Sequence, residues 1–230
     1  MLSRILLINL IALTLTGIHA YGQMPASIPG NLYIDFGPAF FSENPDDIRL
    51  ETQSRGVNIT YLYKAELGES KFSFNPGLGY GHESYFFKNQ ETIQDTGDQN
   101  VILNINDQFD ISDFKKSKLA VNYIDIPLEL HYRSNPGINS FLLGIGIKGG
   151  VRFNTHTKIK LETDNDDLVL QKVYDDFNVR RFRLGAMARI GYGRFHVFGY
   201  YGLVPLFTEK AFEGNNNDHP IFFGISLSRF

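Results

Sequence analysis

Eight charged residues stand at alternating positions of segments whose opposite face is apolar. They are Asp35, Lys64, Asp125, Glu129, Lys148, Arg152, Arg183 and Arg189. Carboxylates and cations that share one face can neutralise one another, conduct ions or exchange protons. Unpaired charges are costly in a narrow, poorly hydrated interior, so mutual pairing is the expected outcome. We predict that these eight residues form a salt-bridged network that fills the interior of the folded protein. The alternative is that they line a path for ions.

The sequence shows no recognisable catalytic motif beside these charged residues. The sequence has no G-x-S-x-G elbow, and His82, His131, His156 and His196 have no Ser or acid at a diagnostic spacing. The absence of Cys removes thiol chemistry, disulfides and cysteine-based zinc sites together. We therefore predict a protein that is not an enzyme and that needs no cofactor.

Two acidic segments offer oxygen ligands that a calcium or magnesium ion accepts. The run from Asp164 fails as an EF-hand loop because Val169 stands where that loop requires glycine. We expect solvated loops without a metal site, although divalent cations bound there could bridge to anionic lipopolysaccharide. The acidic residues are Asp164, Asp166, Asp167, Asp175 and Asp176 in one segment, and Asp95, Asp98, Asp107, Asp110 and Asp113 in the other.

The elements that must position these residues are β-strands, because hydrophobicity alternates with a period of two along most of the chain. In residues 119–132, for example, Ile124, Ile126 and Leu128 alternate with Asp125 and Glu129. The sequence predicts about eight such strands. Their ranges are Leu32–Phe41, Val57–Glu66, Phe72–Phe87, Leu119–Tyr132, Phe141–Phe153, Arg181–Tyr192, Phe195–Leu206 and Ile221–Phe230.

The connections between these strands alternate in length. The long ones are residues 42–56, 88–117, 156–178 and 208–219, and the short ones are 68–71, 133–140 and 192–194. Short periplasmic turns, long extracellular loops and an even strand count are typical of bacterial outer-membrane barrels. The predicted fold class is all-β, a transmembrane up-and-down antiparallel β-barrel.

Aromatic residues near the short turns indicate which face of the strands meets lipid. A ring of Tyr and Phe at one level is typical of a membrane-interface girdle, so the apolar face is expected to point outward. The alternative is a soluble, lipid-binding barrel of lipocalin type with its apolar face inward. The absence of Trp removes the usual G-x-W signature of that class. The girdle candidates are Tyr63, Phe72, Phe74, Tyr132, Phe141, Tyr192 and Phe195.

The first 22 residues have the pattern of a secretory signal peptide. Arg4 precedes an apolar run from Ile5 to Ile18, and the small residues Ala20 and Gly22 follow. The run is short for a membrane anchor, which is the alternative. We expect residues 1–22 to direct export and residues 23–230 to form the barrel domain. A net charge of −3 without any basic run argues against nucleic acid as a partner.

The last strand carries a further signal for the outer membrane. Ile221, Phe223, Ile225 and Leu227 alternate with smaller or polar residues before the terminal Phe230. The pattern resembles the C-terminal signal that the barrel-assembly machinery reads, although the apolar row is displaced by one residue from the final aromatic. The assembly machinery is accordingly an expected partner.

Four segments resemble the PorT-like family of outer-membrane β-barrel proteins. They are YIDIPLEL (123–130), GIGIKGG (144–150), YYGLVPLF (200–207) and FGISLSRF (223–230). The resemblance implies an eight-stranded barrel in the bacterial outer membrane, and the founding member is associated with type IX protein secretion. We predict a structural or accessory role in envelope assembly or protein secretion, with outer-membrane lipid, lipopolysaccharide and secretion or envelope proteins as expected partners. An outer-membrane lipid-modifying enzyme is the remaining alternative.

Overall fold

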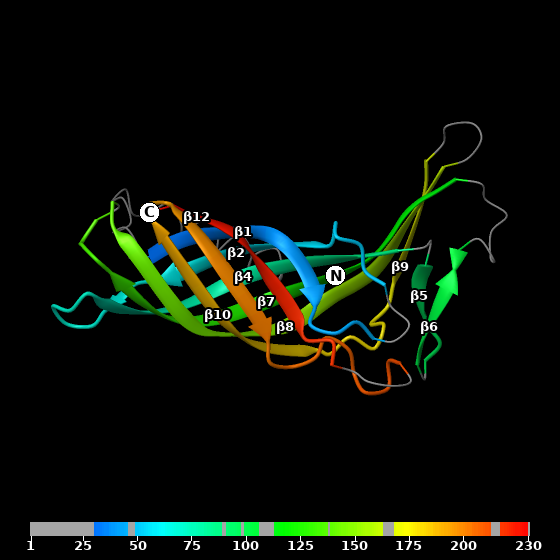
Figure 1. The fold of residues 1–230 in the computed structure, drawn as a ribbon. Coiled ribbons are helices and arrows are strands. Elements are labelled where there is room, and N and C mark those ends of the chain that lie inside the picture. Colours follow the sequence, from blue (N-terminus) through cyan, green and yellow to red (C-terminus); the bar gives the residue numbers. More distant parts are fainter. Residues whose placement is uncertain are drawn as a thin grey trace, which may run out of the picture.

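Eight strands form a closed antiparallel barrel (Figure 1). The computed structural model describes residues 30–45, 49–88, 91–97, 99–105, 113–137, 139–162, 168–212 and 217–229. The barrel strands are β1 (Gly30–Phe41), β2 (Arg55–Tyr63), β4 (Phe72–Phe87), β7 (Asp113–Arg133), β8 (Phe141–Glu162), β10 (Phe182–Tyr192), β11 (Phe195–Gly202) and β12 (Pro220–Arg229). The predicted signal peptide and Phe230 lie outside the described residues.

Each barrel strand pairs with the strands before and after it in this order, and β12 pairs with β1 to close the ring. The seam is regular, since Leu32 lies opposite Arg229 and Phe41 lies opposite Pro220. The prediction of an all-β, up-and-down barrel of about eight strands is therefore confirmed. No helix among the described residues has the length and hydrophobicity needed to cross a membrane.

The apolar side of the strands faces outward. In β1, Leu32, Ile34 and Phe36 are 37%, 42% and 48% exposed, while Tyr33 and Asp35 between them are 0% and 2% exposed. All the other barrel strands also place large apolar side chains on the outer surface. A lipocalin-type barrel requires the reverse orientation, so that alternative is wrong for this chain. An apolar outer band is what contact with lipid requires.

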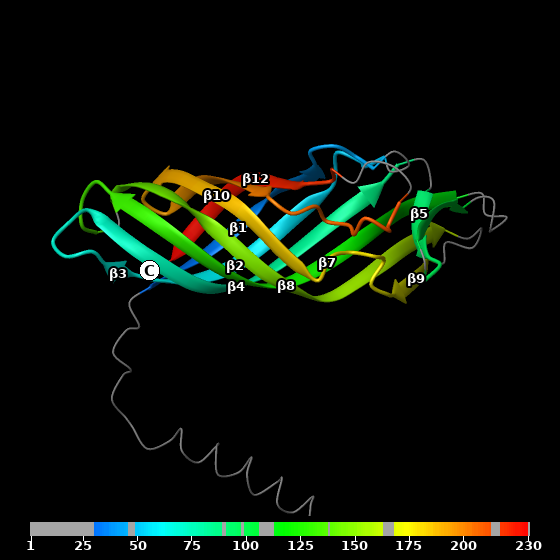
Figure 2. The same ribbon diagram turned by 90° about the horizontal axis from the view of Figure 1, so that it is seen from below.

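The two ends of the barrel differ, as Figure 2 shows. At the short-turn end, tight connections join β2 to β4, β7 to β8 and β10 to β11, and Gly193 adopts φ of +63° in the last of these. The small strand β3 (Ala65–Glu66) pairs with β4 there. The predicted girdle lies at this end, where Phe72 packs against Tyr132 with ring centroids 5.3 Å apart.

At the long-loop end, two predicted loops contain strands instead. Segment 88–117 holds the hairpin of β5 (Glu91–Asp95) and β6 (Asn100–Asn104) as well as the first residues of β7. Segment 156–178 holds the end of β8 and β9 (Leu168–Tyr174), which pairs with it. Lysines and apolar residues mix on these extensions, which hides a strand from a simple search for apolar faces. Cross-strand backbone hydrogen bonds hold them beyond the apolar band.

A buried apolar cluster fills the interior at the long-loop end. It joins lumen-facing strand residues such as Tyr85 and Val121 to loop residues such as Phe207 and Phe212. Phe207 and Phe212 pack edge to face with ring centroids 5.0 Å apart, and Phe41 stacks on Tyr85 at 4.6 Å. Strand β11 ends at Gly202, earlier than the predicted Leu206, because Pro205 lacks an N–H and Leu206 turns into this cluster.

Candidate functional site

The charged side chains inside the barrel form two layers, of which the first lies beneath the apolar cluster. Arg183 on β10 donates from Nε to Asp125 Oδ1 on β7 at 2.8 Å and from Nη2 to Asp125 Oδ2. Its Nη1 donates to Glu83 on β4. The two carboxylate side chains are each 1% exposed and that of Arg183 is 7% exposed. We call Glu83, Asp125 and Arg183 the upper ion-pair cluster.

Tyrosine rings surround the upper cluster. The Arg183 guanidinium carbon lies 3.8 Å from the centroid of the Tyr123 ring. The Tyr85 hydroxyl donates to Glu83 Oε2 at 2.6 Å. Lys148, 2% exposed, places its ammonium 4.2 Å from the centroid of the Tyr200 ring. Aromatic faces attract cations where water is excluded, so these rings stabilise positive charge that would otherwise be poorly solvated.

Glycines make room for this cluster. A Cβ on Gly150 would lie 2.2 Å from Asp125 Oδ1, and one on Gly81 would lie 2.4 Å from Arg183 Nη2. Gly149, the neighbour of Gly150 on the outer face, has no heavy atom within 4 Å of such a Cβ. The glycines on the charged face are thus required by close packing of the ion pairs.

The second layer lies closer to the short-turn end. Arg189 on β10 donates to both oxygens of Glu129, at 2.9 and 3.1 Å, to Asp35 at 3.2 Å and to Ser226 Oγ at 2.8 Å. Its guanidinium carbon lies 4.4 Å from the centroid of the Tyr33 ring. We call Asp35, Glu129 and Arg189 the lower ion-pair cluster. Every one of these three side chains is at most 2% exposed.

A histidine adjoins the lower cluster. His131 Nε2 lies 2.7 Å from Glu129 Oε2, while its Nδ1 has no hydrogen-bond partner among the residues that the structure describes. The rings of His131 and His196 lie 6.1 and 5.8 Å from that of Tyr33. The arrangement holds a carboxylate–histidine pair, but both residues are 1% exposed and no hydroxyl nucleophile is hydrogen-bonded to the ring among the described contacts.

The structure brings together five of the eight residues singled out in the sequence: Asp35, Asp125, Glu129, Arg183 and Arg189. Lys148 is buried beside them without an ion pair among the described contacts. The two others lie elsewhere. Arg152 lies opposite Tyr123, just before the shift in strand register at Asn122, and at the long-loop end its side chain contacts Thr155 at 2.8 Å and Asp176 at 3.9 Å.

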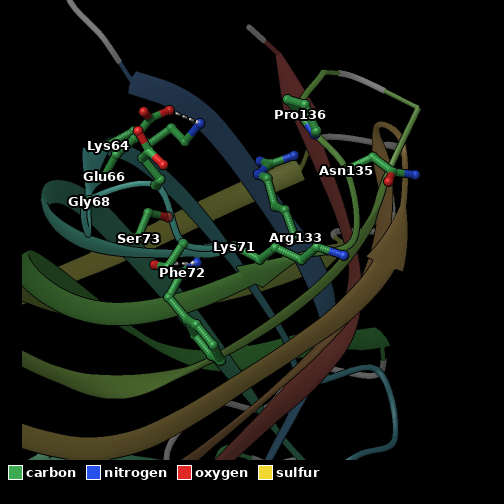
Figure 3. A pocket seen from close by; sticks show the side chains of 11 residues that line it. Lys64, Glu66, Gly68, Lys71, Phe72, Ser73, Arg133, Asn135 and Pro136 are labelled. Atoms are coloured by element: carbon green, nitrogen blue, oxygen red, sulfur yellow. Dashed lines mark hydrogen bonds and ion pairs between the residues drawn. The ribbon is translucent and has the colours of Figure 1, made fainter.

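Lys64 also lies outside the network, because β2 ends at Tyr63 and the alternation of faces ends with it. Lys64 donates to Glu66 at 2.7 Å and lowers the pKa of that exposed carboxyl group. Both line a cavity of about 320 Å³ at the short-turn end, between the β2–β4 hairpin and the turn that contains Asn135 and Pro136 (Figure 3). Lys64 and Arg152 are thus corrections to the predicted network.

Sequence reasoning missed Glu83, which shares Arg183 with Asp125. Its strand was predicted with the correct bounds, and Glu83 has the same parity as Gly79 and Gly81 on the lumen face. The run Tyr85–Phe86–Phe87 places aromatics on both faces and obscured that parity. Ser226 was missed as well, since a serine in the last strand gives no sign that it receives a hydrogen bond from a buried arginine.

Three aspartates meet at the long-loop end. Oxygens of Asp95, Asp175 and Asp176 lie within 4.8 Å of one another, and they come from the two acidic segments noted in the sequence. Carboxylates at this spacing are ligands that calcium accepts. Asp98, Asp107, Asp110, Asp164, Asp166 and Asp167 lie outside the described residues.

A comparison with protein-family models agrees with this architecture. A family model described as outer membrane protein beta-barrel domain matches residues 30–208. Two crystal structures of Ail, the attachment invasion locus protein of Yersinia pestis, are similar at 13% identity, covering 87% of this chain and 99% of theirs. Their TM-scores are 0.38, for a complex with the heparin analogue sucrose octasulfate, and 0.33. No curated protein matches the chain.

Proposed function

Because the chain belongs to the outer membrane protein beta-barrel domain family, we propose that it is a sealed, non-enzymatic barrel of the bacterial outer membrane. Its role is structural or accessory to envelope assembly and protein secretion. The observation that carries the proposal is the filled lumen. The cavity that touches Glu83 and Arg183 has a volume of only about 10 Å³, which is space for a single water molecule.

The charge balance of the lumen supports the same conclusion. The two ion-pair clusters and Lys148 hold three cations and four carboxylates, and His131 adds a fourth cationic group only when it is protonated. A file of ions needs mobile water and weakly held ligands. In this lumen, Arg183 and Arg189 are each held by two carboxylates, and the apolar cluster covers the upper ion-pair cluster.

The absence of enzymatic activity is part of the proposal. Lipid chemistry needs a nucleophile, a base and an orienting group that a substrate can reach. Among the described residues the closest arrangement is a chain in which Ser84 Oγ lies 3.0 Å from His82 Nε2 and His82 Nδ1 lies 2.8 Å from Asn122 Oδ1, a contact that the sequence spacing did not predict. Ser84 is only 2% exposed, and its Oγ also accepts from Lys118 at 3.0 Å. Glu129 and His131 are buried in the lumen. An assay with labelled lipopolysaccharide tests this point, and release or transfer of acyl chains by the purified protein would contradict it.

The finer assignment is to the PorT-like group, on the four sequence segments that resemble it. Two of these segments contribute to the charged lumen, since residues 123–130 supply Asp125 and Glu129 to the ion-pair clusters and residues 144–150 supply Lys148, which is buried beside them. The founding member's association with type IX secretion makes secretion the proposed pathway. Envelope or secretion proteins and the barrel-assembly machinery are the proposed partners.

Two experiments test the function. Planar-bilayer recordings with the refolded protein are expected to show no stable conductance steps, and large, stable steps would exclude a sealed lumen. A deletion strain is expected to lose extracellular enzymes or the processing of surface proteins. Normal secretion with altered envelope permeability would instead assign a purely structural role.

A further inference from the structure

The outer surface of the barrel changes character at one level near the long-loop end. Below this level β4, β7 and β8 present Tyr80, Ile124 and Phe153, which close the apolar band. The rings of Tyr80 and Phe153 lie 6.2 Å apart. The strands continue outward past the band (Figure 1), and their next outer residues are polar. The register places His82 opposite Asn122 and Asn122 opposite Asn154.

Hydrogen bonds organise this polar row. Asn122 Oδ1 accepts from the Tyr80 hydroxyl at 2.7 Å and lies 2.8 Å from His82 Nδ1. Its Nδ2 donates to Asn154 Oδ1 at 3.1 Å, and that oxygen also lies 3.1 Å from His156 Nδ1. The row therefore has fixed side chains, and it continues the lipid-facing side of the sheet directly.

A line of lysines lies above this row. Lys118 on β7 is directly opposite Lys158 on β8, which is directly opposite Lys172 on β9. Like charges in such positions repel and destabilise a sheet. Lys118 shares the Phe86 ring of β4 with Arg55, whose guanidinium carbon and the Lys118 ammonium lie 5.6 and 5.4 Å from the ring centroid. We call Arg55, His82, Lys118, His156, Lys158 and Lys172 the basic strip.

No carboxylate of the described residues forms an ion pair with the basic strip. Burial and the positive charges of Lys158, Arg55 and Lys172 lower the pKa of Lys118. Burial and the charges of Lys172, Lys118, His82 and Lys158 lower the pKa of His156 to about 4. No carboxylate is among the groups that shift either pKa. Within the described residues, this part of the sheet therefore carries excess positive charge that an external anion would balance.

We propose that the basic strip binds the phosphate groups of lipopolysaccharide in the outer leaflet. We infer this ligand from the position of the basic strip. The strip lies on the outer face of the sheet, pointing away from the barrel axis, and it begins where the apolar band ends. Acyl chains on the band bring the phosphates of lipid A to the level of Lys118 and His156. Phosphate oxygens also relieve the repulsion within the lysine line. The inference rests on the outer-membrane placement of the proposed function and not on its sealed lumen.

The test is a titration of the protein in detergent micelles with lipid A that carries both phosphates and with the same lipid after removal of its phosphates. The variant K118Q/K158Q/K172Q is expected to bind phosphorylated lipid A at least about tenfold more weakly than the wild type, the loss expected for one charge-assisted contact or more. Binding to the wild type should also weaken with added salt. The variant should fold, since it removes like-charge repulsion.

The control K71Q/R194Q/K210Q removes the same charge from exposed positions elsewhere and should bind as the wild type does. K118R/K158R/K172R should retain binding. Equal binding by the strip variant, or equal binding of lipid A without phosphates, overturns the proposal. If soluble tripolyphosphate binds as tightly as lipid A, the strip is a general polyanion site and the lipid assignment is wrong. Bilayer conductance is independent of this surface, so failure of either proposal leaves the other intact.

Discussion

Replacing Arg183 by methionine tests whether the upper ion-pair cluster depends on its cation. The substitution leaves two buried carboxylates, Asp125 and Glu83, without the group that donates to both. Breaking a buried pair from one side costs about 3 to 5 kcal/mol, because an uncompensated charge remains. Loss of the stacking on Tyr123 at 3.8 Å adds roughly 1 kcal/mol. We therefore expect the free energy of unfolding to fall by about 4 to 6 kcal/mol.

The assay is urea unfolding in lipid vesicles followed by far-UV circular dichroism, because the protein has no Trp to report by fluorescence. The control is Arg181→Met, the same change two residues away at an exposed position, with an expected effect within about 0.5 kcal/mol. Adding Glu83→Gln and Asp125→Asn to Arg183→Met should recover most of the loss. A loss below about 1 kcal/mol in the single variant, or no recovery in the triple variant, would refute the argument from buried charge.

Three further predictions concern packing around the upper ion-pair cluster, the pH dependence of stability, and the loop residues of the apolar cluster. Gly150→Ala should cost about 1 to 3 kcal/mol in the same urea assay because its Cβ meets Asp125, whereas Gly149→Ala should be neutral; equal effects would contradict the packing argument. The pKa of His156 is lowered to about 4 from 6.5, so its stabilising contribution is complete above pH 6.5 and is lost as the pH falls toward 4. His156→Gln should flatten the pH dependence of the unfolding free energy in that window, and unchanged curves would count against it. Asp218→Ala removes the 2.8 Å hydrogen bond that the Phe207 amide donates to Asp218, so hydrogen exchange around Phe207 should accelerate. Unaltered protection would show that this hydrogen bond does not hold the loop residues of the apolar cluster in place.

The sequence alone was sufficient for the barrel and the orientation of its faces. Period-two alternation and the difference in connection length are local features, and both follow from contact with lipid on one side. Strand β4 was predicted with its exact range, Phe72–Phe87. The strand extensions at the long-loop end were missed because they lie beyond the lipid, where nothing forces the outer face to be apolar. Lys158 and Lys172 occupy that face instead.

The structure confirms only part of the predicted network. Odd or even position along a strand determines which face of the sheet a side chain occupies, but it does not determine the level of that side chain along the barrel axis. Asp125 and Arg183 share a face and also a level, which depends on the register of strands that are not adjacent in sequence. Lys64 was assigned to the interior on the assumption that β2 continued past Tyr63. The basic strip gave no signal in the sequence, since its lysines come from three separate strands and only the pairing of those strands aligns them.

The ion pairs of the lumen connect positions that are far apart along the chain, with separations of 58 residues for Asp125 and Arg183, 100 for Glu83 and Arg183, and 154 for Asp35 and Arg189. A chain that has inserted only its first strands would therefore carry acidic groups whose partners have not yet arrived. Bringing in such charges singly is costly in hydrocarbon, whereas a nearly complete ring brings them in as neutral sets. The lumen thus favours concerted insertion, in which the first and last strands meet before the protein leaves the aqueous side of the membrane.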